Sequence, residues 1–144
     1  MSFTDNDVLI EFNRLTREIN EVYHNVSSKL GISDSAFIIL YALVELGDGC
    51  RQADIVKAYC VNKQTINSSV KKLQKEGYIE LRASKGLDRN IFVTPKGEKI
   101  IEEKIYPIFE IENSIINEFS NEEQIMLSLL TKKYLQKLKE KVSN

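Results

Sequence analysis

The sequence predicts a mainly α-helical protein that carries a small β-hairpin. Three observations lead to this fold class. Apolar residues recur every three or four positions over most of the 144 residues, which is the period of an amphipathic helix. Glycines and capping residues divide this pattern into separate helices. Between positions 78 and 93 two short runs of β-branched and aromatic residues replace the helical period, which indicates a pair of strands.

The N-terminal part of the chain is expected to form two helices. The first covers about 25 residues and ends at Gly31. Its apolar positions step by four and three residues: Val8, Phe12, Leu15, Ile19, Val22 and Val26. The second begins at Ser33 or Asp34, because either side chain can cap it, and Gly47 supplies a left-handed stop. Its apolar face is formed by Phe37, Leu40, Tyr41 and Val44.

The middle of the chain is expected to hold two shorter helices and the hairpin. The third helix is marked by Ile55, Val56 and Tyr59. Asn62 is the expected N-cap of the fourth, because its side chain can accept hydrogen bonds from the backbone N–H of Gln64 or Thr65. Gly77 ends this helix. Strands are expected at 78–82 and 91–93, and the turn between them is formed by Ser84, Lys85 and Gly86.

Two further helices are expected after the hairpin. Thr94 caps the first of them, and Pro95 takes its first position, where a missing N–H costs nothing. Pro107 is expected to kink this helix. Ser120 and Glu123 form a capping box that begins the final helix. The apolar positions are Ile101, Ile105, Ile108, Ile115 and Phe119, and then Met126, Leu130, Tyr134, Leu138 and Val142.

Charge is spread unevenly along the chain, although the net charge is only −1. Residues 1–50 hold 3 basic and 8 acidic side chains, residues 51–99 hold 11 and 5, and residues 100–144 hold 6 and 8. A basic middle third between acidic ends is typical of a surface that contacts phosphates.

The fourth predicted helix has two distinct faces. Ile66, Val70 and Leu73 share the apolar face. The opposite face carries Lys63, Gln64, Asn67, Ser68 and Lys71. Amides, hydroxyls and ammonium groups suit a DNA groove, although a stripe of this kind by itself also fits a solvated helix surface. Two short helices, a tight turn and a hairpin together have the layout of a winged helix-turn-helix.

Residues 51–97 resemble the MarR family of dimeric bacterial winged-helix regulators. The matching pieces are VNKQTINSSVKKLQKEGYIE, the pair Asp88 and Arg89, and TPKGEKI. The family usually has Asp-x-Arg in a longer wing, whereas these two residues are adjacent here and the wing is about two residues short. The resemblance implies one domain over 1–144, with a DNA-binding lobe at 32–97 and dimerisation helices at 1–31 and 98–144.

The resemblance also implies a homodimer that binds a pseudo-palindromic operator in double-stranded DNA and acts as a repressor released by a small ligand. Asp88 would orient the wing. The residues expected to contact DNA are Lys63, Gln64, Thr65, Asn67, Ser68, Lys71, Lys72, Arg82, Lys85 and Arg89. The terminal helices would bury their apolar stripes against the second copy. An intramolecular helix bundle is the alternative for those stripes.

A ligand pocket, in terms of the family, would lie where the dimerisation helices meet the DNA-binding lobe. Tyr23, His24, Phe37 and Tyr41 are candidates by position. Core packing is the competing role for the three aromatic residues. No cofactor or metal is expected, and the identity of an effector stays open.

The sequence offers little to catalysis, since His24 is the only histidine, and an enzyme is not expected. Cys50 and Cys60 are expected to be buried, reduced thiols. Two alternatives remain: a winged-helix module that binds protein instead of DNA, and a regulator that senses redox state through a cysteine. An enzyme that uses Cys60 as nucleophile ranks third.

A cytoplasmic location without membrane contact is expected from two features. The N-terminus MSFTDNDVL lacks a basic-then-apolar signal pattern. The longest apolar runs, such as AFIILYALV, are much shorter than the roughly 20 residues that span a bilayer.

Overall fold

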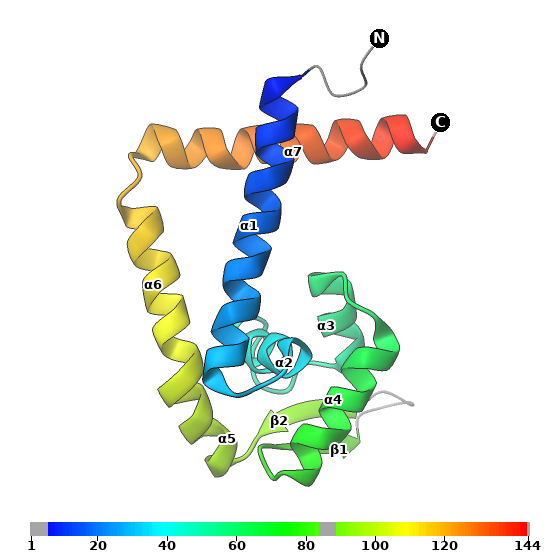
Figure 1. Cartoon of the computed structure of the whole chain (residues 1–144). Helices are drawn as coiled ribbons and strands as arrows, with labels where there is room; N and C mark the ends of the chain where they lie inside the picture. Colours follow the sequence, from blue (N-terminus) through cyan, green and yellow to red (C-terminus); the bar gives the residue numbers. More distant parts are fainter. Residues whose placement is uncertain (1–5, 84–88, 144) are drawn as a thin grey trace. The chain divides into compact units, whose positions relative to one another are not determined.

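The computed structural model describes residues 6–83 and 89–143. It consists of two compact units, Met1–Ile105 and Tyr106–Asn144. The predicted turn at Ser84, Lys85 and Gly86, together with Asp88, lies outside the described residues. Each unit is built from helices in chain order, and the hairpin belongs to the first (Figure 1).

The first unit begins with α1 (Asp7–Leu30) and α2 (Asp34–Glu45). Gly31 has a φ of 74°, so α1 ends in the left-handed conformation that glycine adopts without strain. The side chain of Ser33 accepts a hydrogen bond from the backbone N–H of Ala36 and caps α2. Lys104, further along the unit, donates to the carbonyl oxygen of Leu30 over 2.7 Å and so satisfies the end of α1.

The helix-turn-helix consists of α3 (Gln52–Tyr59) and α4 (Lys63–Lys75). Asn62 caps α4 as predicted: its Oδ1 accepts from the backbone N–H of Gln64 at 2.8 Å and of Thr65 at 3.1 Å. Cys60 ends α3 with a φ of 52°, and this left-handed residue turns the chain from one helix into the next.

The hairpin pairs β1 (Ile79–Ala83) with β2 (Arg89–Val93) in an antiparallel sheet. Ile79 lies opposite Val93, and Ala83 lies opposite Arg89. β2 therefore begins two residues before the predicted strand, and Arg89 belongs to it. Arg51, at the start of α3, forms an isolated bridge to Asn90, so that the helix-turn-helix and the hairpin share backbone contacts.

After the hairpin, α5 (Pro95–Ile100) is capped by Thr94, whose hydroxyl accepts from the backbone N–H of Gly97. Gly97 is buried, and a Cβ at this position would collide with the carbonyl oxygen of Tyr78. The helix continues as the π-helical turn η1 (Ile101–Ile105). This turn ends two residues before Pro107, whose missing N–H leaves a carbonyl of the preceding turn without its α-helical donor, and the kink expected at Pro107 stays a prediction.

The core of the first unit is formed where α2, α3, α4 and the hairpin meet. Each of these elements contributes aliphatic side chains that are almost fully buried. They are Ile39, Ala42, Leu43, Ile55, Ile66, Val70, Leu73, Ile79 and Ile91. This core fixes α4 by its inner face, so that the orientation of its outer face is fixed too.

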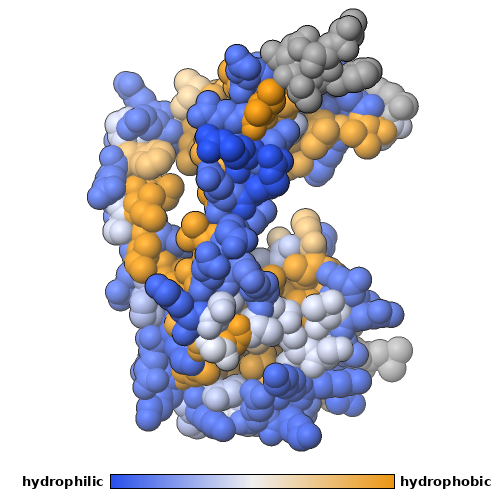
Figure 2. All heavy atoms as spheres, in the orientation of Figure 1, coloured by the Kyte–Doolittle hydropathy of each residue, from blue (hydrophilic) through white to orange (hydrophobic). Residues whose placement is uncertain are grey.

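The second unit contains α6 (Tyr106–Asn117) and α7 (Asn121–Val142). The predicted capping box is present: Ser120 Oγ accepts from the backbone N–H of Glu123, and Glu123 Oε1 accepts from the backbone N–H of Ser120. Neither helix has a buried residue. Figure 2 shows hydrophobic side chains along α6 and α7.

No single helix in the described ranges is both long and apolar enough to cross a membrane. The pair formed by α1 and α2 passes the same test of length and composition only when the two helices are joined across a bend of 95°.

Candidate nucleic-acid interface

α4 presents its polar face outward because its apolar face is held in the core. Ile66, Val70 and Leu73 are buried as predicted. Every member of the predicted polar face is exposed, namely Lys63, Gln64, Asn67, Ser68 and Lys71, and so are the predicted DNA contacts Thr65 and Lys72. Within the described residues, none of the three lysines has a carboxylate in ion-pair contact. Their positive charge therefore faces solvent.

A groove of about 720 Å³ lies between α3, α4 and the hairpin. It is lined by Gln52, Ala53, Val56, Lys57, Lys63, Asn67, Val70, Lys71, Gln74, Leu81 and Arg89. Four of these residues are cationic, and none of them is acidic. A concave surface lined by one sign of charge attracts an anionic partner, because the surrounding protein concentrates the field in the groove.

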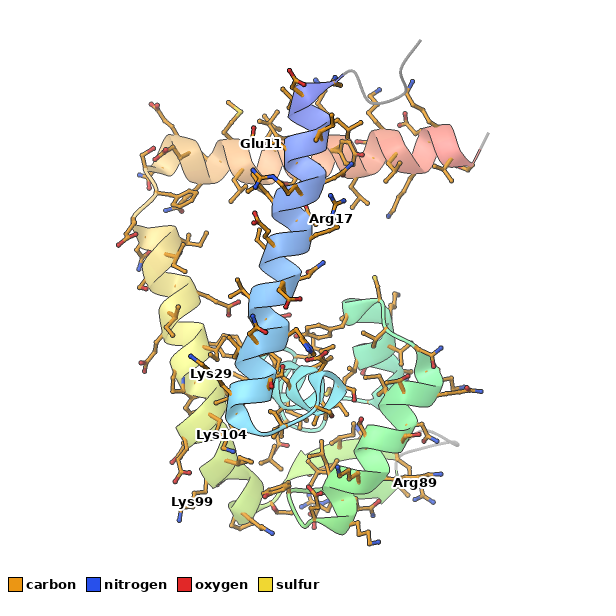
Figure 3. The ribbon with its side chains drawn as sticks, viewed as in Figure 1. Glu11, Arg17, Lys29, Arg89, Lys99 and Lys104 are labelled. Carbon is orange, nitrogen blue, oxygen red and sulfur yellow. The ribbon has the colours of Figure 1, made fainter. Side chains whose placement is uncertain are left out.

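The hairpin contributes Arg89 to this groove. Its side chain is exposed at the start of β2, and in Figure 3 it lies beside α4. Lys99 lies on α5, away from this residue in the same view. Arg89 is therefore placed where the wing of a winged helix would meet a partner of α4.

The predicted contact residues do not all lie together. Lys63, Asn67, Lys71 and Arg89 line the groove, whereas Gln64, Thr65 and Ser68 are exposed outside its lining. Lys72 lines a different cavity of about 170 Å³. Lys85 and the predicted wing-orienting Asp88 lie outside the described residues.

Arg82 is engaged within the hairpin. Its guanidinium binds the carboxylate of Glu80 and lies over the ring of Phe92, 4.1 Å from the ring centroid. Because Glu80 already neutralises it, Arg82 brings less free positive charge to the surface than Arg89 does.

Sequence reasoning missed two polar residues of α3 that line the groove, Gln52 and Lys57. Gln52 Nε2 donates to Asn67 Oδ1 over 3.3 Å, which joins α3 to the exposed face of α4. The sequence held no clear signal for them, since residues five apart on a helix differ by about 140° around its axis and do not share one face. Periodicity alone does not show which helix packs beside them.

The start of α3 is held by a charged capping box. The backbone N–H of Arg51 donates to Asp54 Oδ2 at 3.0 Å, and its Nη2 donates to Asp54 Oδ1 at 3.0 Å. The side chain of Arg51 holds the pKa of Asp54 below its usual range. The carboxylate therefore stays charged, and the cap stays formed, at neutral pH.

The four residues suggested for a ligand pocket fall into two groups. The rings of Phe37 and Tyr41 lie 5.8 Å apart, and Phe37 is buried, so these two rings pack against each other. His24 Nδ1 lies 2.8 Å from Asp34 Oδ2, and the hydrogen bond to Asp34 raises the pKa of His24. The core-packing expectation is wrong for Tyr23, which is 36% exposed because it projects from a helix that covers the core only near its C-terminal end.

The expectation of two buried thiols is wrong for Cys60, which is exposed. Its left-handed backbone places it at the outer corner between α3 and α4 instead of on an inward helix face. Cys50 is half-buried, and burial raises the pKa of its thiol to about 11. Within residues 6–83 and 89–143, no cluster of three His, Cys, Asp or Glu side chains has the arrangement of a metal site.

The helix-turn-helix and the hairpin beside it have the arrangement of a winged helix-turn-helix, and the cationic groove lies between them. A sequence model of the MarR family matches residues 30–89, which include α2, α3, α4 and β1. Over these residues the chain is similar to the MarR family.

Comparison with individual proteins extends this likeness over nearly the whole chain. The HTH-type transcriptional regulator YwoH of Bacillus subtilis is 23% identical over 137 residues, which cover 94% of this chain and 99% of the relative. The structure of NMB1585, a MarR family regulator from Neisseria meningitidis, superposes with a TM-score of 0.82 at 18% identity, covering 96% of this chain and 98% of that one. The complex of Staphylococcus aureus MepR with DNA gives a TM-score of 0.68 at 21% identity, covering 96% and 98%.

Proposed function

We propose that the protein is a homodimeric transcriptional regulator that binds a pseudo-palindromic operator and acts as a repressor released by a small ligand. It acts in the cytoplasm and without catalysis. The observation that carries the proposal is the groove between α3, α4 and the hairpin, where the described lining residues include four cationic side chains and no acidic one. The structure of MepR in complex with DNA supports the same use of this fold.

In this proposal α4 enters the major groove of DNA. Gln64, Asn67 and Ser68 face base edges, because amides and hydroxyls can both donate and accept there. Lys63 and Lys71 lie near phosphates, whose contacts fix the register without reading sequence. Lys57 on α3 is added to the predicted set, since it lines the same groove.

The proposed dimer is supported by apolar side chains that a single chain leaves exposed. On α1 the exposed fractions are 78% for Val8, 57% for Ile19 and 60% for Val22. On α7 Leu130 is 54% exposed. Burial of this apolar surface against a second surface stabilises the protein. A second copy of the same chain, related by two-fold symmetry, is the commonest source of such a surface. A symmetric dimer accounts for an operator with two related half-sites.

Release by a small ligand is proposed from the family resemblance. The effector is unidentified, and no cofactor is proposed. Tyr23, His24, Phe37 and Tyr41 remain the candidate ligand contacts. Chemical-shift changes at these residues on titration with 4-hydroxyphenylacetate, the compound bound in the structure of the MarR-like neighbour NadR, together with loss of DNA affinity, would support the assignment.

Selection of bound sites from random DNA duplexes tests the proposal most directly. We expect a recurring sequence with two inverted half-sites about 10 base pairs apart, or a multiple of that spacing. Affinity for the selected site should fall steeply with salt, because bound lysines and arginines release counterions from phosphates. A failure to select any sequence, together with weak duplex binding that salt does not change, would favour a protein-interaction module instead.

A further inference from the structure

We propose that Gln52 determines sequence specificity by orienting the carboxamide of Asn67. This inference rests on the proposed DNA-binding function. Gln52 is the first residue of α3, and Asn67 lies in the second turn of α4. Both line the cationic groove, and Gln52 Nε2 donates to Asn67 Oδ1 over 3.3 Å.

The two partners in this hydrogen bond differ in how firmly they are held. Gln52 is half-buried, and the residue before it is fixed twice, by the capping box with Asp54 and by the backbone bridge from Arg51 to Asn90 of β2. Asn67 is exposed on the outer face of α4. Gln52 is therefore the anchored partner, and Asn67 is the group presented to DNA.

Orientation matters because the two ends of a carboxamide have nearly the same shape but opposite hydrogen-bonding character. A free asparagine can turn over and present either its oxygen or its NH₂ group. With Oδ1 held by Gln52, the Nδ2 group of Asn67 is the end left for a base. A donor there selects acceptors in the major groove, which are N7 of either purine, O6 of guanine and O4 of thymine.

The sharpest test replaces Gln52 by its acidic isostere. Gln52→Glu keeps the shape but removes the donor, so the carboxylate accepts from Asn67 Nδ2 and turns the amide over. The selected base at the position read by Asn67 should then change toward edges that donate, which are N6 of adenine and N4 of cytosine. Gln52→Ala should weaken the original preference about three- to tenfold without creating a new one.

Two controls separate orientation from charge and from folding. Gln74→Glu introduces the same charge into the same groove and should lower affinity for all duplexes equally, with no change in base preference. In an Asn67→Ala background, Gln52→Glu should no longer change the preferred base. Selection with Asn67→Ala alone identifies the base position concerned, and circular dichroism establishes that each variant is folded.

Several results would overturn the inference. One is an unchanged base preference in both Gln52 variants, and another is a change caused by Gln52→Glu that persists in the Asn67→Ala background. An equal loss of affinity for all duplexes in Gln52→Ala would assign Gln52 a purely structural role. If Asn67→Ala selects the same sequence as the wild-type protein, Asn67 reads no base and Gln52 has no base-reading side chain to orient. If the wild-type protein selects no sequence at all, it is the proposed DNA-binding function that fails.

Discussion

Ser35 on α2 and Ser69 on α4 join the two helices through their hydroxyl groups, whose oxygens lie 2.5 Å apart. Ser35 Oγ also lies 3.3 Å from the hydroxyl of Ser33, the N-cap of α2. Both Ser35 and Ser69 are half-buried, so water replaces the bond between them poorly. α4 is thus attached to α2 by a polar contact as well as by its apolar face.

Removing one hydroxyl of this pair should destabilise the protein. We expect Ser69→Ala and Ser35→Ala each to lower the free energy of unfolding by about 1 kcal/mol, because the remaining hydroxyl loses its partner. Urea denaturation of the two single variants and of the double variant measures this. The double variant should lose less than the sum of the single losses. Additive losses would show that the two hydroxyls do not interact.

Dimer formation should depend on the apolar faces of the terminal helices. Ile19→Asp and Leu130→Asp are expected to break the dimer or unfold it, since each places a carboxylate on an apolar surface proposed to be buried. Light scattering at micromolar concentration reports the mass. Asn20→Asp and Ser128→Asp, at exposed polar positions of the same helices, serve as controls and should leave the dimer intact. A stable, folded wild-type monomer would contradict the proposal.

Base reading should depend on two exposed amides of α4. Gln64→Ala and Asn67→Ala are expected to weaken binding to the selected site by roughly 1–3 kcal/mol each, and binding to random duplex by much less. Fluorescence anisotropy with both duplexes gives the comparison. Equal losses on both duplexes would mean that the amides contact the DNA backbone or do not touch DNA.

The wing should contact phosphate through Arg89. Arg89→Ala is expected to lower operator affinity and to reduce the slope of log affinity against log salt by roughly one unit. Lys85→Ala, measured alongside, tests the other basic candidate of the short wing. If only the Lys85 substitution lowers affinity and slope, the contact lies nearer the turn and the assignment to Arg89 is wrong.

The two cysteines should differ strongly in reactivity. Since the pKa of Cys50 is raised to about 11, only about one molecule in a thousand carries its thiolate at pH 8, and a half-buried sulfur is also hard to reach. We expect an alkylating reagent to modify the exposed Cys60 first and Cys50 slowly, at a rate that rises with pH. Mass spectrometry after timed alkylation, with Cys50→Ser to identify the slow site, measures the order. Faster modification of Cys50 would contradict the burial seen here.

Features that depend on neighbouring residues could be predicted from the sequence. Asn62, Thr94 and Ser120 cap their helices as expected, because an N-cap needs only a suitable side chain and the backbone N–H groups two or three residues later. The same holds for the split of α4 into a buried and an exposed face, which helical geometry dictates.

Features that depend on how helices pack could not be predicted. Gln52 and Asn67 are 15 residues apart, and nothing in their own helices indicates that the two amides meet. Cys60 was assigned to the interior from the usual preference of its residue type, but its left-handed backbone between two helices decided otherwise. The groove itself depends on the angle between α3, α4 and the hairpin, which no periodic pattern encodes.

The contact of Gly97 with the backbone of Tyr78 determines how closely the first turn of α5 approaches the start of β1. Side chains packed between two elements can change rotamer and so let the elements shift, but Gly97 has no side chain, and a Cβ at this position would lie 2.0 Å from the carbonyl oxygen of Tyr78. The residue that leads into β1 and the first turn of α5 touch through main-chain atoms, which have no rotamers to exchange. A side chain at position 97 would therefore force α5 and the start of β1 apart, so the close approach of these two elements requires glycine there.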